Sequence, residues 1–261
     1  MRWKLLLVFC LFASVGTSAQ ERSNGRSHSA RPLLFPTENT SVLNGRPQYF
    51  YMGLDRLIGG RNEFSWEGGM YGWVRNSRST PAGSVFTRFH EGIDIAPVAR
   101  DEDGEPLDVV LAIDEGRVVY VNSSARRSDY GRYVVVEYIW DGSPFYVLHA
   151  HLAETNVREG EYVDRGDQLG ILGYSGEGLD RARAHVHFEI NLMLSEHFVE
   201  WRSVRHPGWP SAHGRFHGYN LVGVPPMEVL SRRYDDRRSI IVFLETEDAE
   251  ITVLVPGGPT P

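Results

Sequence analysis

Short apolar runs, separated by turn-forming residues, are the feature that most constrains what this chain can fold into. Clusters of Gly, Pro, Asp or Ser divide the runs, and β-branched and aromatic residues are frequent in them, most of all in residues 133–138. Asp141-Gly142-Ser143-Pro144 predicts a hairpin turn after that strand. No long helical pattern interrupts the series, so the sequence predicts a mainly β fold of antiparallel sheets. The runs are residues 93–96, 109–113, 117–122, 132–140, 145–152, 168–174 and 185–192.

The N-terminus has the pattern of a secretory signal. Arg2 and Lys4 precede an apolar run at residues 5–15, which is too short to span a bilayer as a helix. Small residues at 17–19 suit a cleavage site, so residues 1–19 are predicted to be removed and the protein to be exported, to the periplasm or the medium. No later segment is long and apolar enough to cross a membrane. No transmembrane segment is therefore expected in the mature chain.

Composition divides the remainder into a β-rich centre with irregular N- and C-terminal extensions. The C-terminal part is expected to hold a short helix near residues 226–233, a hairpin formed by residues 239–245 and 250–255, and a flexible tail. The predicted divisions are an N-terminal extension at 20–68, a central domain at 69–194, an excursion rich in Trp, His, Gly and Pro at 195–226, and a terminal region at 227–261.

Charge and cysteine content exclude several kinds of partner and bond. Loss of residues 1–19 takes away two basic residues and no acidic one, so the net charge moves from −7 to −9. An acidic chain without a basic run argues against nucleic acid as a partner. Cys10 is the only cysteine and lies in the signal segment, so the mature chain is held by its core or by a metal. The sequence gives no indication of the oligomeric state.

Two histidine motifs, far apart in the chain, together predict a metal site. His185 and His187 are one residue apart in a strand pattern and therefore share a face of that strand. His90 and Asp94 are four apart and would also share a face if the segment is extended. A helical His-Glu-x-x-His site is absent, because position 94 is Asp. Two imidazoles and one carboxylate suit zinc with an open fourth position.

A third motif, His149-Ala150-His151-Leu152, adds further histidines at the end of an apolar run. With this motif included, the chain from about Gly69 to Leu194 resembles the LytM/lysostaphin-type family of zinc metallopeptidases. Order and approximate spacing of the motifs also agree. The stretches that carry the resemblance are residues 88–96, 116–120, 130–136, 149–152, 163–170, 173–176 and 184–189.

The resemblance implies a LytM-type domain, similar to a duplicated hybrid motif, with a role for each motif. His90, Asp94 and His187 match the ligands of Zn2+. His151 and His185 match two catalytic histidines, although the sequence does not decide which is the base and which binds the oxyanion.

Two positions depart from the family pattern. His149 stands where the family has Tyr, so His149 and His151 compete for the catalytic place; the following Leu favours His151. Ala184 stands where a Pro usually precedes the His-x-His motif.

Further candidates lie beside these motifs. His149, which would share a strand face with His151, and Glu189, which would share a face with His187, are interpreted as partners that orient site residues. Arg181 and Arg183 belong to a solvated loop or bind a substrate carboxylate.

The resulting hypothesis is an exported zinc endopeptidase that cuts peptidoglycan stem or cross-link peptides. Two alternatives stay open: a non-catalytic relative that binds peptidoglycan or activates an amidase, and a secreted metalloprotease acting on proteins. A further hypothesis has residues 20–68 cover the active site.

Overall fold

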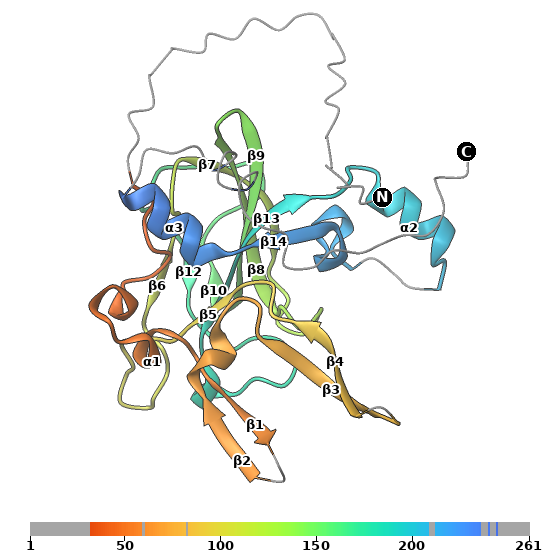
Figure 1. Cartoon of the computed structure of the whole chain (residues 1–261). Coiled ribbons are helices and arrows are strands. Elements are labelled where there is room, and N and C mark those ends of the chain that lie inside the picture. Colours follow the sequence, from red (N-terminus) through yellow and green to blue (C-terminus); the bar gives the residue numbers. More distant parts are fainter. Residues whose placement is uncertain are drawn as a thin grey trace, which may run out of the picture.

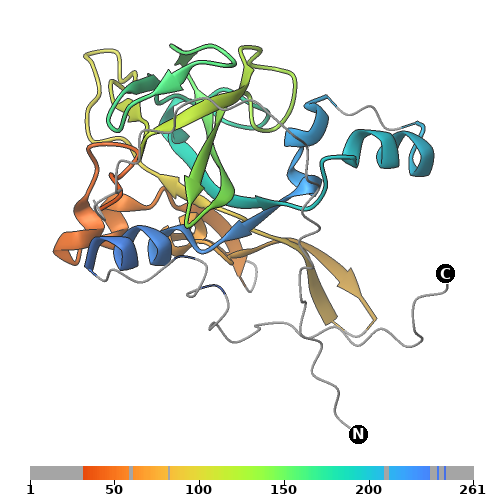
Figure 2. The same cartoon turned by 90° about the horizontal axis from the view of Figure 1, so that it is seen from above.

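The structure is a computed structural model that describes residues 32–58, 61–81, 83–208 and 212–235, with residues 240 and 244 (Figures 1 and 2). The predicted signal at 1–19 and the C-terminal tail lie outside these residues. The predicted C-terminal hairpin lies almost wholly outside them too. Its two described residues, Ile240 and Leu244, have helical backbone where a strand was expected.

An antiparallel sheet forms the centre of the molecule, in the strand order β11-β7-β8-β9-β13-β14, with β5 paired to β13 beside β14 (Figure 1). A smaller sheet of order β10-β12-β6 packs near it. The prediction of a mainly β fold with antiparallel sheets is confirmed. The strands of the two sheets are β5 (Ile93–Ile95), β6 (Val109–Leu111), β7 (Gly116–Asn122), β8 (Arg132–Trp140), β9 (Ser143–Leu152), β10 (Glu154–Thr155), β11 (Tyr162–Val163), β12 (Gln168–Ile171), β13 (Val186–Met193) and β14 (Leu221–Val224).

Two hairpins project from the main sheet, and short helices lie around it (Figure 1). Among the described residues, no helix is long and apolar enough to cross a membrane. The hairpins are β1 (Leu54–Ile58) with β2 (Arg61–Ser65), and β3 (Val74–Thr80) with β4 (Gly83–Phe89). The helices are α1 (Pro47–Phe50), α2 (Phe198–Arg205) and α3 (Pro226–Asp235), with 3-10 turns η1 (Ser41–Asn44), η2 (Trp66–Gly69), η3 (Arg181–Arg183), η4 (Gly214–Phe216) and η5 (Gly218–Asn220).

The predicted strands of the centre are all present, and the predicted turn joins β8 to β9. Asp141 and Gly142 have φ of 53° and 80°, the left-handed backbone that a tight hairpin turn requires at its two central positions. Strand β12 ends at Ile171, earlier than the predicted residue 174. The short helix predicted near residues 226–233 is also present, as α3.

Helix α2 was not predicted, because residues 195–226 were expected to be irregular. Phe198 and Arg202 are four apart and both buried, which gives this helix an inner face despite its polar composition. The guanidinium of Arg202 lies 5.7 Å from the ring centres of Phe198 and Tyr219. The excursion is therefore partly a packed element.

The N-terminal segment is integrated into the fold rather than loosely attached. Phe50 and Tyr51 belong to the main apolar core, and Tyr51 bridges Ile95 at the edge of β5. The backbone N–H of Met52 donates to the carbonyl of Asp94 at 2.8 Å. Residues 51 and 52 of the predicted N-terminal extension therefore continue the sheet beyond β5.

A β-bulge near the end of β9 changes the direction of one side chain. Val134 pairs with His149 and Arg132 pairs with Leu152, so two residues of β9 lie opposite one residue of β8. The extra residue is accommodated by His151, which has φ of 64°. His149 consequently stays on the face of Phe188, its partner in β13, while His151 turns toward His185. The prediction that the two histidines share a face is wrong.

Gly92 sets the distance between the His90 segment and β13. A methyl group at this position would lie 2.5 Å from the carbonyl oxygen of Phe188. We expect Gly92→Ala to lower the free energy of unfolding by about 1–3 kcal/mol, because overpacking forces the two segments apart. Chemical denaturation of Gly208→Ala, where the new methyl group meets no atom within 4 Å, is the control. Equal stability of the two variants would contradict the expectation.

Candidate metal centre and its histidine pair

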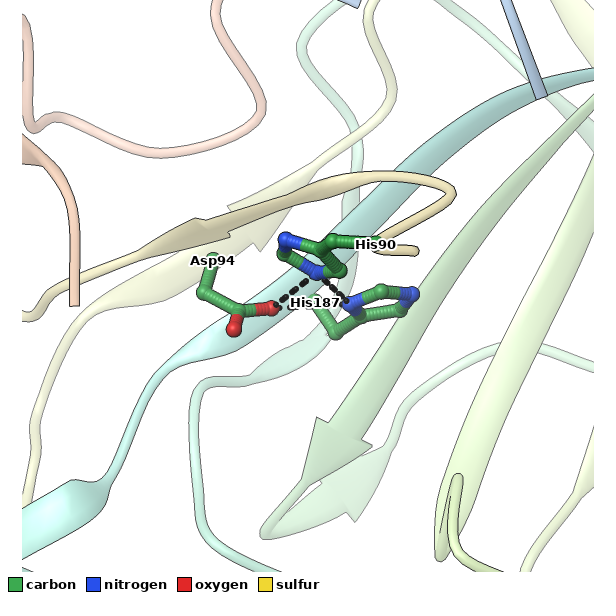
Figure 3. Close-up of side chains that lie close together, drawn as sticks. All are labelled: His90, Asp94 and His187. Carbon is green, nitrogen blue, oxygen red and sulfur yellow. Dashed lines mark hydrogen bonds and ion pairs between the residues drawn. The ribbon is translucent and has the colours of Figure 1, made fainter. Parts of the chain in front are cut away.

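Three side chains from separate segments converge on one point (Figure 3). His90 Nε2 lies 2.9 Å from Asp94 Oδ1 and 3.0 Å from His187 Nδ1, and the latter two atoms are 2.8 Å apart. All three residues are buried. These are the three residues predicted as metal ligands, and the structure brings them together.

Strand pairing explains how the residues meet. Asp94 on β5 is the register partner of His187 on β13, so their side chains leave the same face of the sheet. His90 follows the last residue of β4, and a bend at residues 91–92 returns its ring over Asp94. Strand β5 begins at Ile93, as the predicted run at 93–96 indicated, so the bend and not an extended backbone brings His90 to Asp94.

The donor set fits a zinc ion. Ligand atoms about 2.0–2.2 Å from a tetrahedral zinc lie roughly 3.3 Å from one another, and the three observed separations are slightly shorter. His90 Nδ1 lies 2.9 Å from the Met70 carbonyl, which fixes it as the protonated nitrogen. The lone pair of His90 Nε2 then points at the shared position. Two lone pairs and a carboxylate oxygen directed at one point form a cation site.

The outer nitrogen of His187 is held by a carboxylate. Nε2 of His187 lies 2.6 Å from Glu189 Oε1, so Nε2–H donates and Nδ1 is left as the ligand atom. Glu189 also accepts from the Tyr130 hydroxyl at 3.0 Å and from Asn191 Nδ2 at 2.9 Å. Glu189 was predicted from strand alternation. Tyr130 lay in a recognised motif without a role, and Asn191 was missed.

Two further histidines lie against the three ligands. The rings of His151 and His185 are 4.7 Å apart between centres, and His185 Nε2 lies 3.5 Å from Asp94 Oδ1. His151 Nδ1 donates to the Ser175 carbonyl at 2.9 Å, and His185 Nδ1 donates to the Arg183 carbonyl at 2.7 Å. In each neutral ring Nδ1 therefore carries the proton, and Nε2 is the unprotonated nitrogen.

Burial and charge set the protonation of these groups. Burial lowers the pKa of His151 well below 6.5 and also lowers the pKa of His185. Both rings are therefore neutral at pH 7, the form that can accept a proton. Burial alone would likewise lower the pKa of His187, but the carboxylates of Asp94 and Glu189 outweigh it and raise that pKa to about 10. Without a metal, His187 is the residue that carries the positive charge.

His149 does not belong to the site. It is fully buried, its ring centre is 5.2 Å from that of Phe188, and neither ring nitrogen has a hydrogen-bond partner among the described residues. The backbone of Val134 lies close by and opposes only part of the effect of burial. The interpretation of His149 as a partner of the site residues is therefore wrong, because the bulge separates it from His151.

The isolation of His149 predicts a pH effect on stability. Burial lowers its pKa from 6.5 to about 3, so between these pH values the unfolded chain binds a proton that the folded protein does not. Stability is lost as the pH falls from 6.5, by up to about 5 kcal/mol. We expect His149→Leu to show a smaller loss when urea unfolding is measured at pH 7 and pH 4. A loss equal to that of wild type would contradict this.

The two predicted arginines lie beside the centre, in η3. Arg181 Nη1 lies 3.4 Å from Glu105 Oε1, and the Arg181 carbonyl accepts from Arg100 Nη1 at 2.9 Å. Arg181 thus ties η3 to the 100–105 loop. Arg183 provides the carbonyl that orients His185, and its Nε is buried with no hydrogen-bond partner among the described residues.

Sequence reasoning missed Arg75. Arg75 Nη2 donates to Asp94 Oδ2 at 3.0 Å. Arg75 lies in a polar segment of β3 that gives no sign of contact with a site nineteen residues later. Only the hairpin geometry brings the two residues together.

A buried His/Asp/His set beside two neutral histidines, on an antiparallel sheet, is an arrangement suited to metal-dependent hydrolysis. Residues 88–198 match the model of Peptidase family M23. The resemblance predicted from the motifs is therefore confirmed. Members of family M23 are zinc peptidases, and together with the ligand set this confirms the predicted cofactor, Zn2+.

Several solved structures resemble this chain. The catalytic domain of lysostaphin from Staphylococcus simulans is 20% identical, over 62% of this chain and 89% of that one, with a TM-score of 0.37. A mutant catalytic domain of the prophage-encoded protein EnpA from Enterococcus faecalis is 24% identical, over 45% and 78%, with a TM-score of 0.32. A zinc-containing peptidase from Vibrio cholerae is 22% identical, over 53% and 43%, with a TM-score of 0.31. No curated protein gives a significant match.

Proposed function

We propose that this protein is an exported zinc-dependent endopeptidase that hydrolyses peptide bonds in bacterial cell-wall peptidoglycan. The observation that carries the proposal is the convergence of His90, Asp94 and His187, with His151 and His185 alongside. Three ligands leave coordination positions for reacting groups, as in catalytic rather than structural zinc sites. The two neutral histidines supply the proton transfers that amide hydrolysis needs.

The proposed mechanism assigns a task to each side chain. His90, Asp94 and His187 would hold a zinc ion, which would supply a Lewis acid to acidify water and polarise the scissile carbonyl. A neutral imidazole, from His151 or His185, accepts a proton from the attacking water and returns it to the leaving amine. The other imidazole can donate to the developing oxyanion only after its Nε2 takes up a proton and the ring becomes an imidazolium, because its Nδ1–H already donates to a backbone carbonyl. Glu189 holds His187 in the ligating tautomer.

Peptidoglycan as substrate and export as destination rest on the family and the sequence. Members of family M23 act on peptidoglycan, and the N-terminal pattern is that of a secretory signal.

Stem and cross-link peptides carry free carboxylates. We propose that Arg183, whose buried Nε has no hydrogen-bond partner among the described residues, binds one of them, whereas Arg181 already pairs with Glu105. Turnover of substrates with and without the terminal carboxylate tests this; equal losses in Arg183→Ala would contradict it.

The proposed boundaries are a removed signal at 1–19 and a peptidase domain at 69–194, with the remaining parts attached to it. Residues 20–68 are proposed to limit access to the metal centre. Because described residues of this segment belong to the core, substitutions test its role better than truncation. Higher activity after replacing exposed residues of the segment would support restricted access, and unchanged activity would contradict it.

Zinc content and dye release from labelled bacterial cell walls test the function together. We expect one zinc per chain, wall cleavage, and loss of both on chelation. Zinc without wall cleavage would favour a metalloprotease that acts on proteins. Neither zinc nor cleavage would favour a non-catalytic relative, since some members of the family are inactive. Mass spectrometry of fragments from defined walls identifies the bond that is cut.

A further inference from the structure

The carboxylate of Asp94 is divided between two partners. Its Oδ1 faces His90 and His187 at the metal position, at 2.9 and 2.8 Å. Its Oδ2 accepts a hydrogen bond from Arg75 Nη2 at 3.0 Å. A carboxylate with both oxygens free can turn and bind a metal through both. The partner on Oδ2 therefore decides whether Asp94 binds through one oxygen or two.

Arg75 is itself held in place. The same Nη2 donates to the carbonyl of Gly68 at 2.9 Å, within η2. Gly68 is fixed there by close packing, since a methyl group on it would lie 2.5 Å from Leu54 Cγ. The Arg75 side chain is 32% exposed and that of Asp94 is 4% exposed, so the contact is mostly shielded from water. A charge-assisted hydrogen bond in such a place is stronger than one on the surface.

Arg75 lies on the same hairpin that leads into a second ligand, His90. Arg75 on β3 is the register partner of Arg88 on β4, and Arg88 lies two residues before His90. The base of one hairpin therefore supplies His90 and also contacts Asp94. Arginines directly opposite each other repel, so this arrangement opposes pairing of the hairpin unless an anion compensates it. Asp94 is the anion in contact with Arg75.

We propose that Arg75 is a positioning residue for the metal centre: its guanidinium holds Oδ2 of Asp94, so that only Oδ1 faces the metal. The inference rests on the proposed function of the same site. Arg75 also changes the net charge of the site. The ionised carboxylates of Asp94 and Glu189 neutralise a divalent metal, and Arg75 adds one positive charge that favours a developing oxyanion. Asp94 with a single ligating oxygen leaves room for the reacting groups.

Zinc affinity, measured by competition with a chelator, tests the proposal without any peptidase assay. We expect Arg75→Gln to raise the Kd for zinc by about 10–100-fold, as loss of a group that orients a ligand does in other zinc sites. Arg75→Lys should give an intermediate Kd, since it keeps the charge but not the forked donor. The matched control is Arg78→Gln, an exposed arginine on the same strand, which should bind zinc as wild type does.

The absorption spectrum of the Co2+-substituted protein is the second readout, because it reports the coordination number. A changed spectrum in Arg75→Gln supports a second oxygen of Asp94 entering the coordination sphere. Wild-type Kd and spectrum in Arg75→Gln would overturn the proposal. If Arg75→Gln does not fold, the same result in Arg75→Lys would overturn it. If wild type binds zinc but cuts no wall, the proposed function fails while this proposal is still decided by the metal measurements.

Discussion

His187→Ala is expected to abolish zinc binding and peptidase activity and to destabilise the metal-free protein. The substitution removes one of three ligands. It also leaves the buried carboxylates of Asp94 and Glu189 without the cation that both contact, at 2.8 and 2.6 Å. Breaking a buried ion pair by removing one partner costs about 3–5 kcal/mol. Elemental analysis for zinc, dye release from labelled walls and urea unfolding after chelation measure the three effects.

His197→Ala is the matched control for this variant. His197 is exposed at the start of α2, and its side chain makes no capping hydrogen bond. It should keep wild-type zinc content, activity and stability. Stoichiometric zinc in His187→Ala would contradict its role as a ligand. Unchanged stability of the metal-free variant would contradict the charged His187 inferred from the two carboxylates.

His151→Asn is expected to lower kcat by about 10²–10⁴-fold while zinc content stays at one per chain. Among the described residues, His151 makes no hydrogen bond to a ligand, but its ring centre lies 4.7 Å from that of His185 and 5.8 Å from that of His187. Asparagine is chosen because it tolerates the left-handed backbone, φ of 64°, that the bulge requires. Loss of activity then reports the missing imidazole rather than a displaced strand. Steady-state kinetics on a defined peptide, with zinc analysis, check it.

His149→Leu is the control here, two residues away in the same strand. Its side chain lies in the apolar core on the other face, so kcat should stay near wild type. If His149→Leu loses activity and His151→Asn keeps the kcat of wild type, the assignment of the two histidines is reversed. Loss of zinc in His151→Asn would mean that His151 supports the metal instead of moving protons.

The strands could be predicted from sequence because they are local patterns, and the ligand set because its motifs resemble those of a known family. Residues 132–140 form a run of β-branched and aromatic residues, which predicts a strand, and the run ends at a turn of fixed chemistry; the observed β8 has the same bounds. His185 and His187 share a face for the same reason. The convergence with His90 was not derivable from local pattern alone. It depends on a bend at Gly92, whose missing side chain allows close contact with Phe188.

The errors also have physical causes. His149 and His151 were placed on one face because strand alternation was assumed, and a bulge breaks alternation without an obvious sequence signal at Ala150. Arg75 was missed because an arginine among polar residues resembles any solvated position. Its contact with Asp94 is a property of how two segments pack, not of either segment. Likewise, Phe50 and Tyr51 looked irregular but complete the core.

The bulge in β9 means that chain length, as well as residue type, specifies the histidine pair. Deleting Ala150 would restore regular pairing between β8 and β9 and bring the imidazole at position 151 into alternation with its neighbours. A strand shorter by this one residue would still carry two histidines before the Leu but would not turn the second one toward His185. The number of residues between Val147, the last valine of β9, and the histidine that faces His185 therefore decides whether the strand can supply the histidine pair.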